Sequence, residues 1–167
     1  RELLRDAAAL GVVPWGISFH VGSQQRDPPQ WDTAVGEAAA LFRALEEDGI
    51  ELGMLNIGGG FPARYRKDIP TLCRYGACIR RSIARHFGNR IPDVIVEPGR
   101  QMVGSAGIIE TEVVLISTKS ANDNRRWVFL DIGKFGGLAE TEGEAIQYPI
   151  KSPRRGRAER VILAGPT

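Results

Sequence analysis

The sequence predicts an α/β fold in the first part of the chain and a β domain after it. Short apolar segments alternate with long amphipathic ones between residues 1 and 100, in the order helix, strand, helix, strand, helix, strand. Such an alternation is typical of a parallel sheet covered by helices. From about residue 106 onward the apolar segments alternate like strands, and no segment with a helical period separates them.

Three helices are expected in the first part, and a glycine follows the end of each. We place them at residues 1–10, 31–48 and 70–87. The second has apolar residues at spacings of three and four, namely Val35, Ala38, Ala39, Phe42 and Leu45. The third has an apolar stripe at Leu72, Ile79, Ile83 and Phe87. Each stripe predicts the helix face that packs against the sheet.

The strands of the first part are expected at residues 15–21, 52–57 and 93–96, and each runs into a polar or glycine-rich segment. Ligands bind at the C-terminal ends of such strands, both in open α/β sheets and in closed (β/α)₈ barrels. After a switch near residues 104–107, further strands are expected at 108–117, 127–132, 148–150 and 161–163. Residues 119–126 are a predicted hairpin loop, and the Arg-rich segment 151–160 is a predicted solvated loop.

Composition and charge exclude several classes of function. The net charge is +2, so we expect no nucleic-acid partner and no membrane partner. Cys73 and Cys78 are five residues apart without a His or Cys cluster around them. We therefore expect thiols of a reducing, cytoplasmic compartment and no metal site. The chain opens at Arg1 inside a predicted helix and ends directly after an apolar run, so we expect an interior fragment of a longer protein.

The three strand ends carry residues suited to chemistry. His20 can act as a general acid or base or stack on a ring, and Ser23 can donate to a phosphate. Gly58-Gly59-Gly60 lets the backbone approach a phosphate closely, although neither G-x-G-x-x-G nor a Walker loop is present. Glu97 suits a protonated pyridine nitrogen, and Arg100 suits a phosphate. Each feature alone also has a structural explanation: a hydrogen-bonding histidine, a flexible turn and an ion pair.

Taken in this order, the three motifs resemble a known family. H-V-G-S at residues 20–23, G-G-G-F-P at 58–62 and E-P-G-R at 97–100 are similar to motifs of the fold-type III pyridoxal-phosphate decarboxylases. This group contains ornithine, arginine and diaminopimelate decarboxylases and shares its barrel with alanine racemase. Residues 20–31 and 130–146 look most like bacterial ornithine decarboxylases, and residues 164–167 resemble the start of a GPTCDS-type motif. Phe61-Pro62 favours that branch over diaminopimelate decarboxylases, which usually carry Leu-Gly there.

The resemblance implies the C-terminal part of a (β/α)₈ TIM barrel over residues 1–105 and the start of a β domain over residues 106–167. It implies pyridoxal 5'-phosphate as cofactor, whose ring acts as the electron sink of decarboxylation. The expected catalytic residues are His20, which would stack on the ring, and Glu97, which would keep the ring nitrogen protonated. The expected cofactor-binding residues are these two together with Ser23, Gly58, Gly59, Gly60, Gly99 and Arg100.

The resemblance places other parts of the active site outside the chain. The family's Schiff-base lysine belongs before Arg1 and its general-acid cysteine just after Thr167, so we expect the chain alone to be inactive and only marginally folded. An acidic residue that contacts the substrate is expected among Glu140, Glu142 and Glu144.

The resemblance further implies decarboxylation of L-ornithine to putrescine, in polyamine biosynthesis, by a homodimer. Two alternatives remain open. One is a decarboxylase of the same family that acts on lysine, arginine, diaminopimelate or carboxynorspermidine. The other is a catalytically silent homologue that acts as a binding protein, as antizyme inhibitors do. The intact residues His20, Glu97 and Arg100 argue against the silent homologue.

Overall fold

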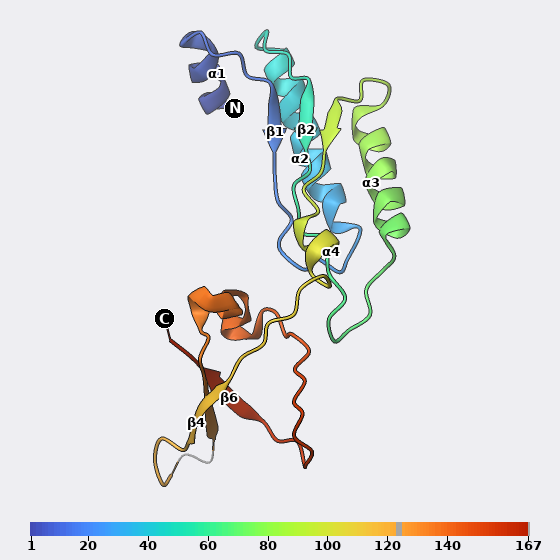
Figure 1. Ribbon diagram of the computed structural model, residues 1–167. Coiled ribbons are helices and arrows are strands. Elements are labelled where there is room, and N and C mark those ends of the chain that lie inside the picture. The colour runs from blue at the N-terminus through green and yellow to red at the C-terminus, as the bar shows by residue number, and fades with distance from the viewer. Residues whose placement is uncertain (123–124, 167) are drawn as a thin grey trace. The chain divides into compact units, whose positions relative to one another are not determined.

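The computed structural model of the chain describes residues 1–122 and 125–166, without the side chain of Glu144, and forms two compact units (Figure 1). The first unit contains residues Arg1–Arg64 and Asp68–Ala106. The second contains residues Tyr65–Lys67 and the chain from Gly107 onward. Each unit has its own sheet, so each is described by itself.

Helices and strands of the first unit alternate in the predicted order. They are α1 (Glu2–Ala9), β1 (Gly16–Ser18), α2 (Gln30–Glu46), β2 (Met54–Asn56), α3 (Leu72–Phe87), β3 (Asp93–Ile95) and a short α4 (Gly99–Val103). The three strands form one parallel sheet in the order β1-β2-β3, which confirms the expected parallel arrangement. Each strand has three residues and is shorter than its apolar segment predicts.

Backbone hydrogen bonds continue between neighbouring segments beyond the ends of these strands. Ser18 in β1 lies opposite Asn56 in β2, which in turn lies opposite Ile95 in β3. One residue further on, the Phe19 amide donates to the Asn56 carbonyl at 3.1 Å. The Glu97 amide donates to the Gly58 carbonyl at 2.9 Å. The segments that follow the three strands therefore start side by side.

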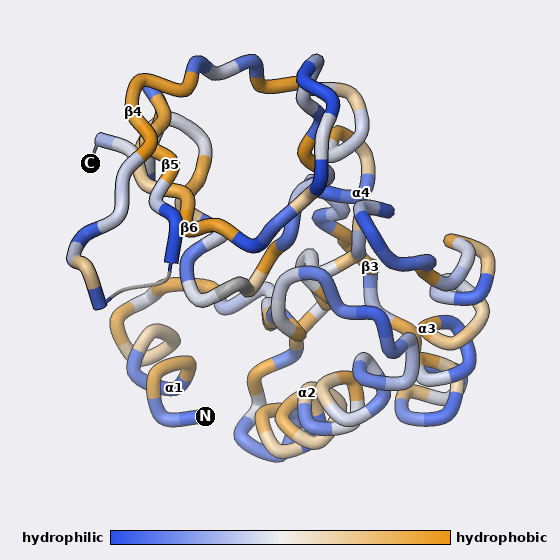
Figure 2. Tube along the Cα trace, turned by 90° about the horizontal axis from the view of Figure 1, so that it is seen from below, coloured by the Kyte–Doolittle hydropathy of each residue, from blue (hydrophilic) through white to orange (hydrophobic). Residues whose placement is uncertain are grey.

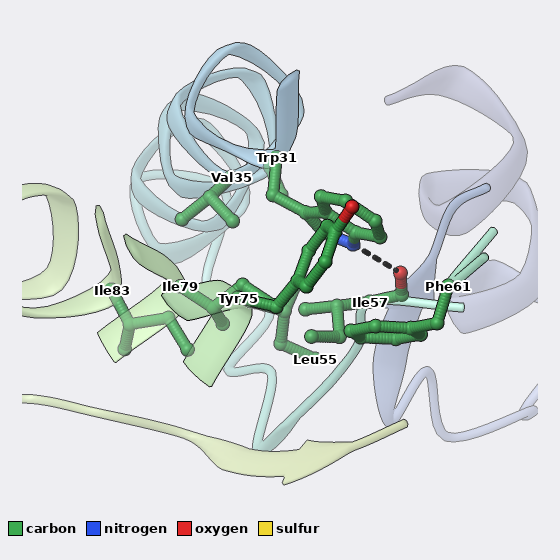
Figure 3. Close-up of a cluster of buried hydrophobic side chains, with 9 residues drawn as sticks. Trp31, Val35, Leu55, Ile57, Phe61, Tyr75, Ile79 and Ile83 are labelled. Carbon is green, nitrogen blue, oxygen red and sulfur yellow. Dashed lines mark hydrogen bonds between the residues drawn. The ribbon is translucent and has the colours of Figure 1, made fainter. Parts of the chain in front are cut away.

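The core of this unit lies between the sheet and the pair of helices α2 and α3 (Figure 3). Trp31 of α2 is fully buried, and its indole N–H donates to the Ile57 carbonyl at 3.3 Å. Its ring lies 4.8 Å from that of Phe61 and 5.6 Å from that of Tyr75, centroid to centroid. Ile57 and Phe61 flank the three glycines, so this aromatic cluster anchors the glycine segment on both sides.

The buried stripe of α3 differs from the predicted one at Leu72, and Phe87 at the other end of the helix is only partly buried. Leu72 is 54% exposed, whereas Tyr75, three residues later, is buried with Ile79 and Ile83. Leu72 is the first residue of the helix and lies away from the core cluster, while the Tyr75 hydroxyl donates to the Gln25 carbonyl at 2.9 Å. This hydrogen bond satisfies the polar end of a ring that is otherwise apolar. Figure 2 shows hydrophobic and hydrophilic residues alternating along both helices.

A polar network joins α2 to α3 on the outer side of this core. The Asp32 carboxylate accepts from the Ser82 hydroxyl at 2.7 Å and from Arg85 Nη1 at 2.9 Å, and it lies 3.2 Å from His86 Nε2. The Ser82 hydroxyl, followed by the charges of Arg85 and His86, lowers the pKa of the Asp32 carboxyl. The network therefore stabilises the helix pair most when Asp32 is ionised.

A second carboxylate holds α1 near the C-terminal end of α2. Arg1 Nε and Arg5 Nε donate to Asp48 Oδ2 at 2.8 Å and 2.6 Å. Hydrogen bonds from Arg5 and then Arg1 hold the pKa of the Asp48 carboxyl well below its usual range. No residue of α1 is buried within this unit, so this charge cluster is its main described attachment.

The second unit contains a three-stranded sheet. Its strands are β4 (Val113–Ser117), β5 (Arg126–Leu130) and β6 (Val161–Ala164), with β4–β5 antiparallel and β5–β6 parallel. Between β5 and β6 lie a π-helical turn, η1 (Lys134–Leu138), and a 3₁₀ segment, η2 (Ala139–Glu144). The hydropathy colouring shows β4 as a predominantly hydrophobic strand (Figure 2).

One strand prediction in this unit is wrong, and another is too long. Residues 148–150 form no strand, because the central residue is Pro149, which has no N–H to donate to a ladder. The strand predicted over residues 108–117 begins only at Val113. Just before it, the Thr111 hydroxyl and the Glu112 amide both donate to the Asp131 carboxylate, and these contacts lower the pKa of that carboxyl.

None of the helices in the described residues combines the length and the apolar character that a membrane crossing requires. The two cysteines are both free, and Cys73 is exposed while Cys78 is partly exposed.

Candidate functional site

The three predicted motifs meet at one cavity of about 220 Å³ in the first unit. The cavity lies at the C-terminal ends of β1, β2 and β3, where the sequence places the motifs. Seven of the eight predicted site residues line it, namely His20, Ser23, Gly59, Gly60, Glu97, Gly99 and Arg100. The eighth, Gly58, is buried at the start of the glycine segment. The predicted roles of these residues remain proposals.

The glycine segment is confined by the segments on both sides of it. A Cβ atom at Gly58 would overlap the Phe19 carbonyl oxygen, and Gly58 has a φ of +65° that L residues rarely adopt. A Cβ atom at Gly59 would lie 2.8 Å from the Glu97 carbonyl oxygen and 3.2 Å from His20 Cε1. The absence of side chains thus lets the segments after β1 and β3 touch the segment after β2.

The same confinement holds at the other end of the glycine segment. Gly60 has a φ of +96°, and a Cβ atom there would lie 2.6 Å from the Gly22 carbonyl oxygen. Gly60 therefore packs directly against the H-V-G-S segment. Because all three glycines are closely packed, a flexible turn does not explain them. Their lack of side chains keeps the cavity open between His20, Ser23 and Glu97.

Asn56 holds Glu97, although it was not among the residues predicted for the site. Its side-chain amide donates from Nδ2 to Glu97 Oε1 at 2.9 Å. Its Oδ1 accepts from the Gly58 amide, also at 2.9 Å. One side chain therefore orients the carboxylate of one motif and the backbone of another. The available signal was a polar residue at the end of an apolar strand, directly before Ile57 and the glycines.

Gln24 and Phe61 also line the cavity and were not predicted as site residues. Phe61 is buried in the aromatic cluster with Trp31 and Tyr75, so it forms part of the floor. Gln24 connects the segment after β1 to the segment after β2 through hydrogen bonds to Ala63. Phe61 belongs to the G-G-G-F-P motif itself, and Gln24 directly follows the H-V-G-S motif in the sequence.

The chemical groups at the cavity suit a ligand with both an anionic and a cationic part. A guanidinium (Arg100) and a hydroxyl (Ser23) can donate to phosphate oxygens, since charge-assisted hydrogen bonds are the natural contacts of a phosphate. The Glu97 carboxylate, fixed by Asn56, can accept from a protonated ring nitrogen. The exposed His20 ring offers a flat face for stacking. These groups fit a phosphorylated pyridine.

The pyridoxal binding domain of the pyridoxal-dependent decarboxylases matches residues 1–104 of the chain, which covers nearly all of the first unit and all eight predicted site residues. The chain belongs to this family. Pyridoxal 5'-phosphate is the family's cofactor, as the resemblance implied. The three parallel strands with their helices are therefore part of a (β/α)₈ barrel, and the expected fold class is confirmed.

Among characterised relatives, the lysine/ornithine decarboxylase of Selenomonas ruminantium is 34% identical over 169 residues, 99% of this chain and 41% of that protein. Antizyme inhibitor 2 of Xenopus laevis is 33% identical over 115 residues, 68% of this chain and 25% of that protein. The crystal structure of SrLDC in complex with PLP and cadaverine is similar with a TM-score of 0.74 and 32% identity. That similarity covers 99% of this chain and 42% of the other. The chain thus spans about two fifths of the length of these decarboxylases.

The expected substrate-contacting glutamates lie in the second unit. Glu142 Oε2 forms an ion pair with Lys134 Nζ at 2.8 Å, and this contact lowers the pKa of the Glu142 carboxyl. The side chain of Glu144 lies outside the described residues, as does Thr167, the last residue of the motif at residues 164–167. The choice among the three glutamates therefore stays a prediction, and Glu142 already has a cationic partner within its own unit.

Proposed function

We propose that the protein containing this chain decarboxylates a basic amino acid with pyridoxal 5'-phosphate, and that its substrate is L-ornithine, which gives putrescine. The observation that carries the proposal is the single cavity at which His20, Ser23, Glu97 and Arg100 meet. Membership of the decarboxylase family supports the reaction type. The similarity to a lysine/ornithine decarboxylase over 99% of the chain supports a diamine-forming substrate.

Each residue of the cavity has a part in this proposal. The cofactor supplies an electron sink that stabilises the carbanion formed when CO₂ leaves. Glu97 would hold a proton on the ring nitrogen, and the hydrogen bond from Asn56 would orient the Glu97 carboxylate for this role. The flat face of the exposed His20 side chain would stack on the ring. Ser23 and Arg100 hold the phosphate.

The glycines act through their backbone and through the space they leave. Gly58 continues the ladder, with its carbonyl accepting from the Glu97 amide. Gly59 leaves room between the His20 ring and the Glu97 backbone, and Gly60 and Gly99 present backbone at the cavity wall for the phosphate. The protein therefore supplies orientation and electrostatics.

We further propose the domain organisation and setting that the resemblance implies. Residues 1–105 belong to the C-terminal portion of the barrel and residues 106–167 to the start of the β domain. The full-length protein acts in the cytoplasm as a homodimer, in polyamine biosynthesis. The chain by itself is inactive, because it contains neither a lysine that matches the family's Schiff-base lysine nor the general-acid cysteine of the GPTCDS-type motif.

A panel assay tests substrate and reaction type together. Full-length protein with added cofactor is given ornithine, lysine, arginine and diaminopimelate separately, and the released CO₂ is measured. We expect ornithine to have the highest kcat/KM. A higher value for another amino acid would reassign the substrate within the family. Cofactor binding without CO₂ from any of the four would instead favour a silent homologue, a type to which the similar antizyme inhibitor 2 draws attention.

The Glu97→Gln variant tests the role of the carboxylate. Glutamine keeps an oxygen that can accept from Asn56 but cannot hold a proton on the ring nitrogen, so kcat should fall on the order of 100-fold. The matched control is Glu51→Gln, an exposed glutamate before the start of β2, which should leave kcat unchanged. An equal, small effect of both substitutions would contradict the proposed role.

A further inference from the structure

Gln24 has an unusual backbone conformation next to the cavity. Its φ is +57°, and it is the only residue other than glycine with a positive φ among residues 1–122 and 125–166. A side chain in this left-handed region is strained, and such strain persists only where surrounding contacts hold it. Glycine is the residue that adopts this conformation without strain. The presence of glutamine therefore indicates that its side chain does something a glycine could not.

The side-chain amide of Gln24 makes two hydrogen bonds to the backbone of one buried residue. Its Nε2 donates to the Ala63 carbonyl at 2.7 Å, and its Oε1 accepts from the Ala63 amide at 2.8 Å. Ala63 is only 5% exposed, so its amide and carbonyl have little access to water. An amide side chain is matched to this task, because it carries one donor and one acceptor side by side.

A neighbouring backbone contact joins the same two segments. The Gln25 amide donates to the Gly60 carbonyl at 2.8 Å, three residues before Ala63. Gly22, which precedes Ser23 in the sequence, also lies against Gly60, since its carbonyl oxygen is 2.6 Å from the position that a Cβ atom on Gly60 would take. Ser23 is thus flanked by residues that are fixed against the glycine segment.

We propose that Gln24 is a positioning residue that sets the separation between Ser23 and Gly60 and thereby the affinity for the phosphate group of the cofactor. The inference rests on the proposed function, since it assigns Ser23 and Gly60 to the phosphate. Gln24 acts through these two neighbours, although it also lines the cavity itself. Its strained backbone turns Ser23 toward the cavity, and its side chain holds the turn in place through Ala63.

The substitution Gln24→Gly separates this role from a passive one. Glycine relieves the strained φ but removes both hydrogen bonds to Ala63. If Gln24 only occupied a turn, glycine would leave cofactor binding unchanged and would not lower stability. If it positions the phosphate site, the full-length protein should bind pyridoxal 5'-phosphate roughly tenfold more weakly, the size expected when two hydrogen bonds are lost against some relief of strain.

The decisive measurement is the affinity for pyridoxal 5'-phosphate divided by the affinity for pyridoxal. Apo full-length protein is titrated with pyridoxal 5'-phosphate and with pyridoxal, which lacks the phosphate. We expect Gln24→Gly to reduce that ratio by about tenfold, with pyridoxal binding changed by less than about twofold. An unchanged ratio would overturn the inference, as would an equal loss of affinity for both compounds. Gln24→Ala and Gln30→Ala form a matched pair, since each removes one side-chain amide. Gln30 is exposed at the start of α2, so the Gln30→Ala variant should bind both compounds as the wild type does.

A second variant decides the matter if the glycine variant does not fold. Gln24→Met keeps the approximate length and the neutral charge of the side chain but removes both hydrogen bonds to Ala63, and circular dichroism verifies that it folds. The same ratio should fall, and a ratio equal to that of the wild type would overturn the inference. Failure of the proposed function has a different signature: the wild-type protein itself would bind pyridoxal no more weakly than the phosphorylated compound.

Discussion

Replacing Asn56 with alanine should lower kcat through Glu97 and lower stability through Gly58. The substitution removes the donor that holds Glu97 Oε1 at 2.9 Å and the acceptor that holds the Gly58 amide at 2.9 Å. The first contact involves a carboxylate proposed to act on the cofactor ring. The second involves a buried backbone amide at the start of the glycine segment. The two losses should therefore appear in different measurements.

The magnitudes follow from the type of each hydrogen bond. A bond to a charged group contributes about 1.5–3 kcal/mol, and the exposed Glu97 side chain points to the lower end because water can partly replace the amide. About 1.5 kcal/mol corresponds to a roughly tenfold lower kcat. Leaving the buried Gly58 amide without a partner costs about 1–3 kcal/mol in the free energy of unfolding.

A double-mutant cycle separates the two effects in the full-length protein. The kcat for CO₂ release and the urea unfolding midpoint are measured for Asn56→Ala, Glu97→Ala and the double variant. In the Glu97→Ala background, Asn56→Ala should lose its effect on kcat but keep its effect on stability. Asn89→Ala, an exposed asparagine in the turn after α3, is the control and should change neither quantity.

One result would refute this reasoning directly. If Asn56→Ala lowers kcat by the same factor whether or not Glu97 is present, the amide does not act through that carboxylate. The hydrogen bond between them would then be incidental to the reaction. An Asn56→Ala variant with wild-type kcat and a lowered unfolding midpoint would leave Asn56 with its contact to Gly58 alone.

Three further outcomes are expected. Gly60→Val should weaken binding of pyridoxal 5'-phosphate by more than tenfold and should also lower the melting temperature, because its φ of +96° disfavours a branched residue and a Cβ atom would lie 2.6 Å from the Gly22 carbonyl oxygen; a lowered melting temperature with wild-type affinity in the titration would contradict a role of this segment in phosphate binding. Trp31→Phe should lower the free energy of unfolding by about 1–3 kcal/mol, since the Ile57 carbonyl loses its donor and a void remains, and a urea midpoint equal to that of the wild type would argue against this. Because the pKa of the Asp32 carboxyl is lowered, its ionised form stabilises the fold above pH ~4, and this stabilisation is lost at lower pH. Ser82→Ala should therefore reduce the drop in melting temperature between pH 7 and pH 3, and an undiminished drop would contradict the proposed effect of this hydrogen bond.

The helix and strand order followed from local pattern, because the apolar period records which side of each element is buried. Val35, Ala38 and Leu45 of α2 are buried as their spacing predicted. The error at Leu72 arose because a tyrosine with a hydrogen-bonded hydroxyl can replace a leucine in a core, which no apolar count anticipates. The strand expected around Pro149 failed because the missing N–H outweighs apolar neighbours.

The motif residues at the cavity could be predicted from the sequence, but the residues that hold them in place could not. His20, Ser23, Glu97 and Arg100 carry chemistry that is visible in a linear sequence, at the ends of successive strands. Asn56 and Gln24 act through partners 41 and 39 residues away in the chain. Such contacts depend on the register of neighbouring strands and on loop geometry, so a single sequence does not reveal them.

The backbone hydrogen bonds that continue past the strand ends make the proposed cofactor site depend on folding of the first unit. The cavity exists only when three strands, separated by two crossovers of roughly 35 residues each, stand in register. An unfolded chain has no such cavity, so a ligand that contacts all three strand ends binds the folded form alone. At a concentration of 100 times its Kd, such a ligand adds about 2.7 kcal/mol to the free energy of unfolding. At the proposed site the cofactor would stabilise the folded sheet as well as take part in the reaction, so the melting temperature should rise with the concentration of pyridoxal 5'-phosphate.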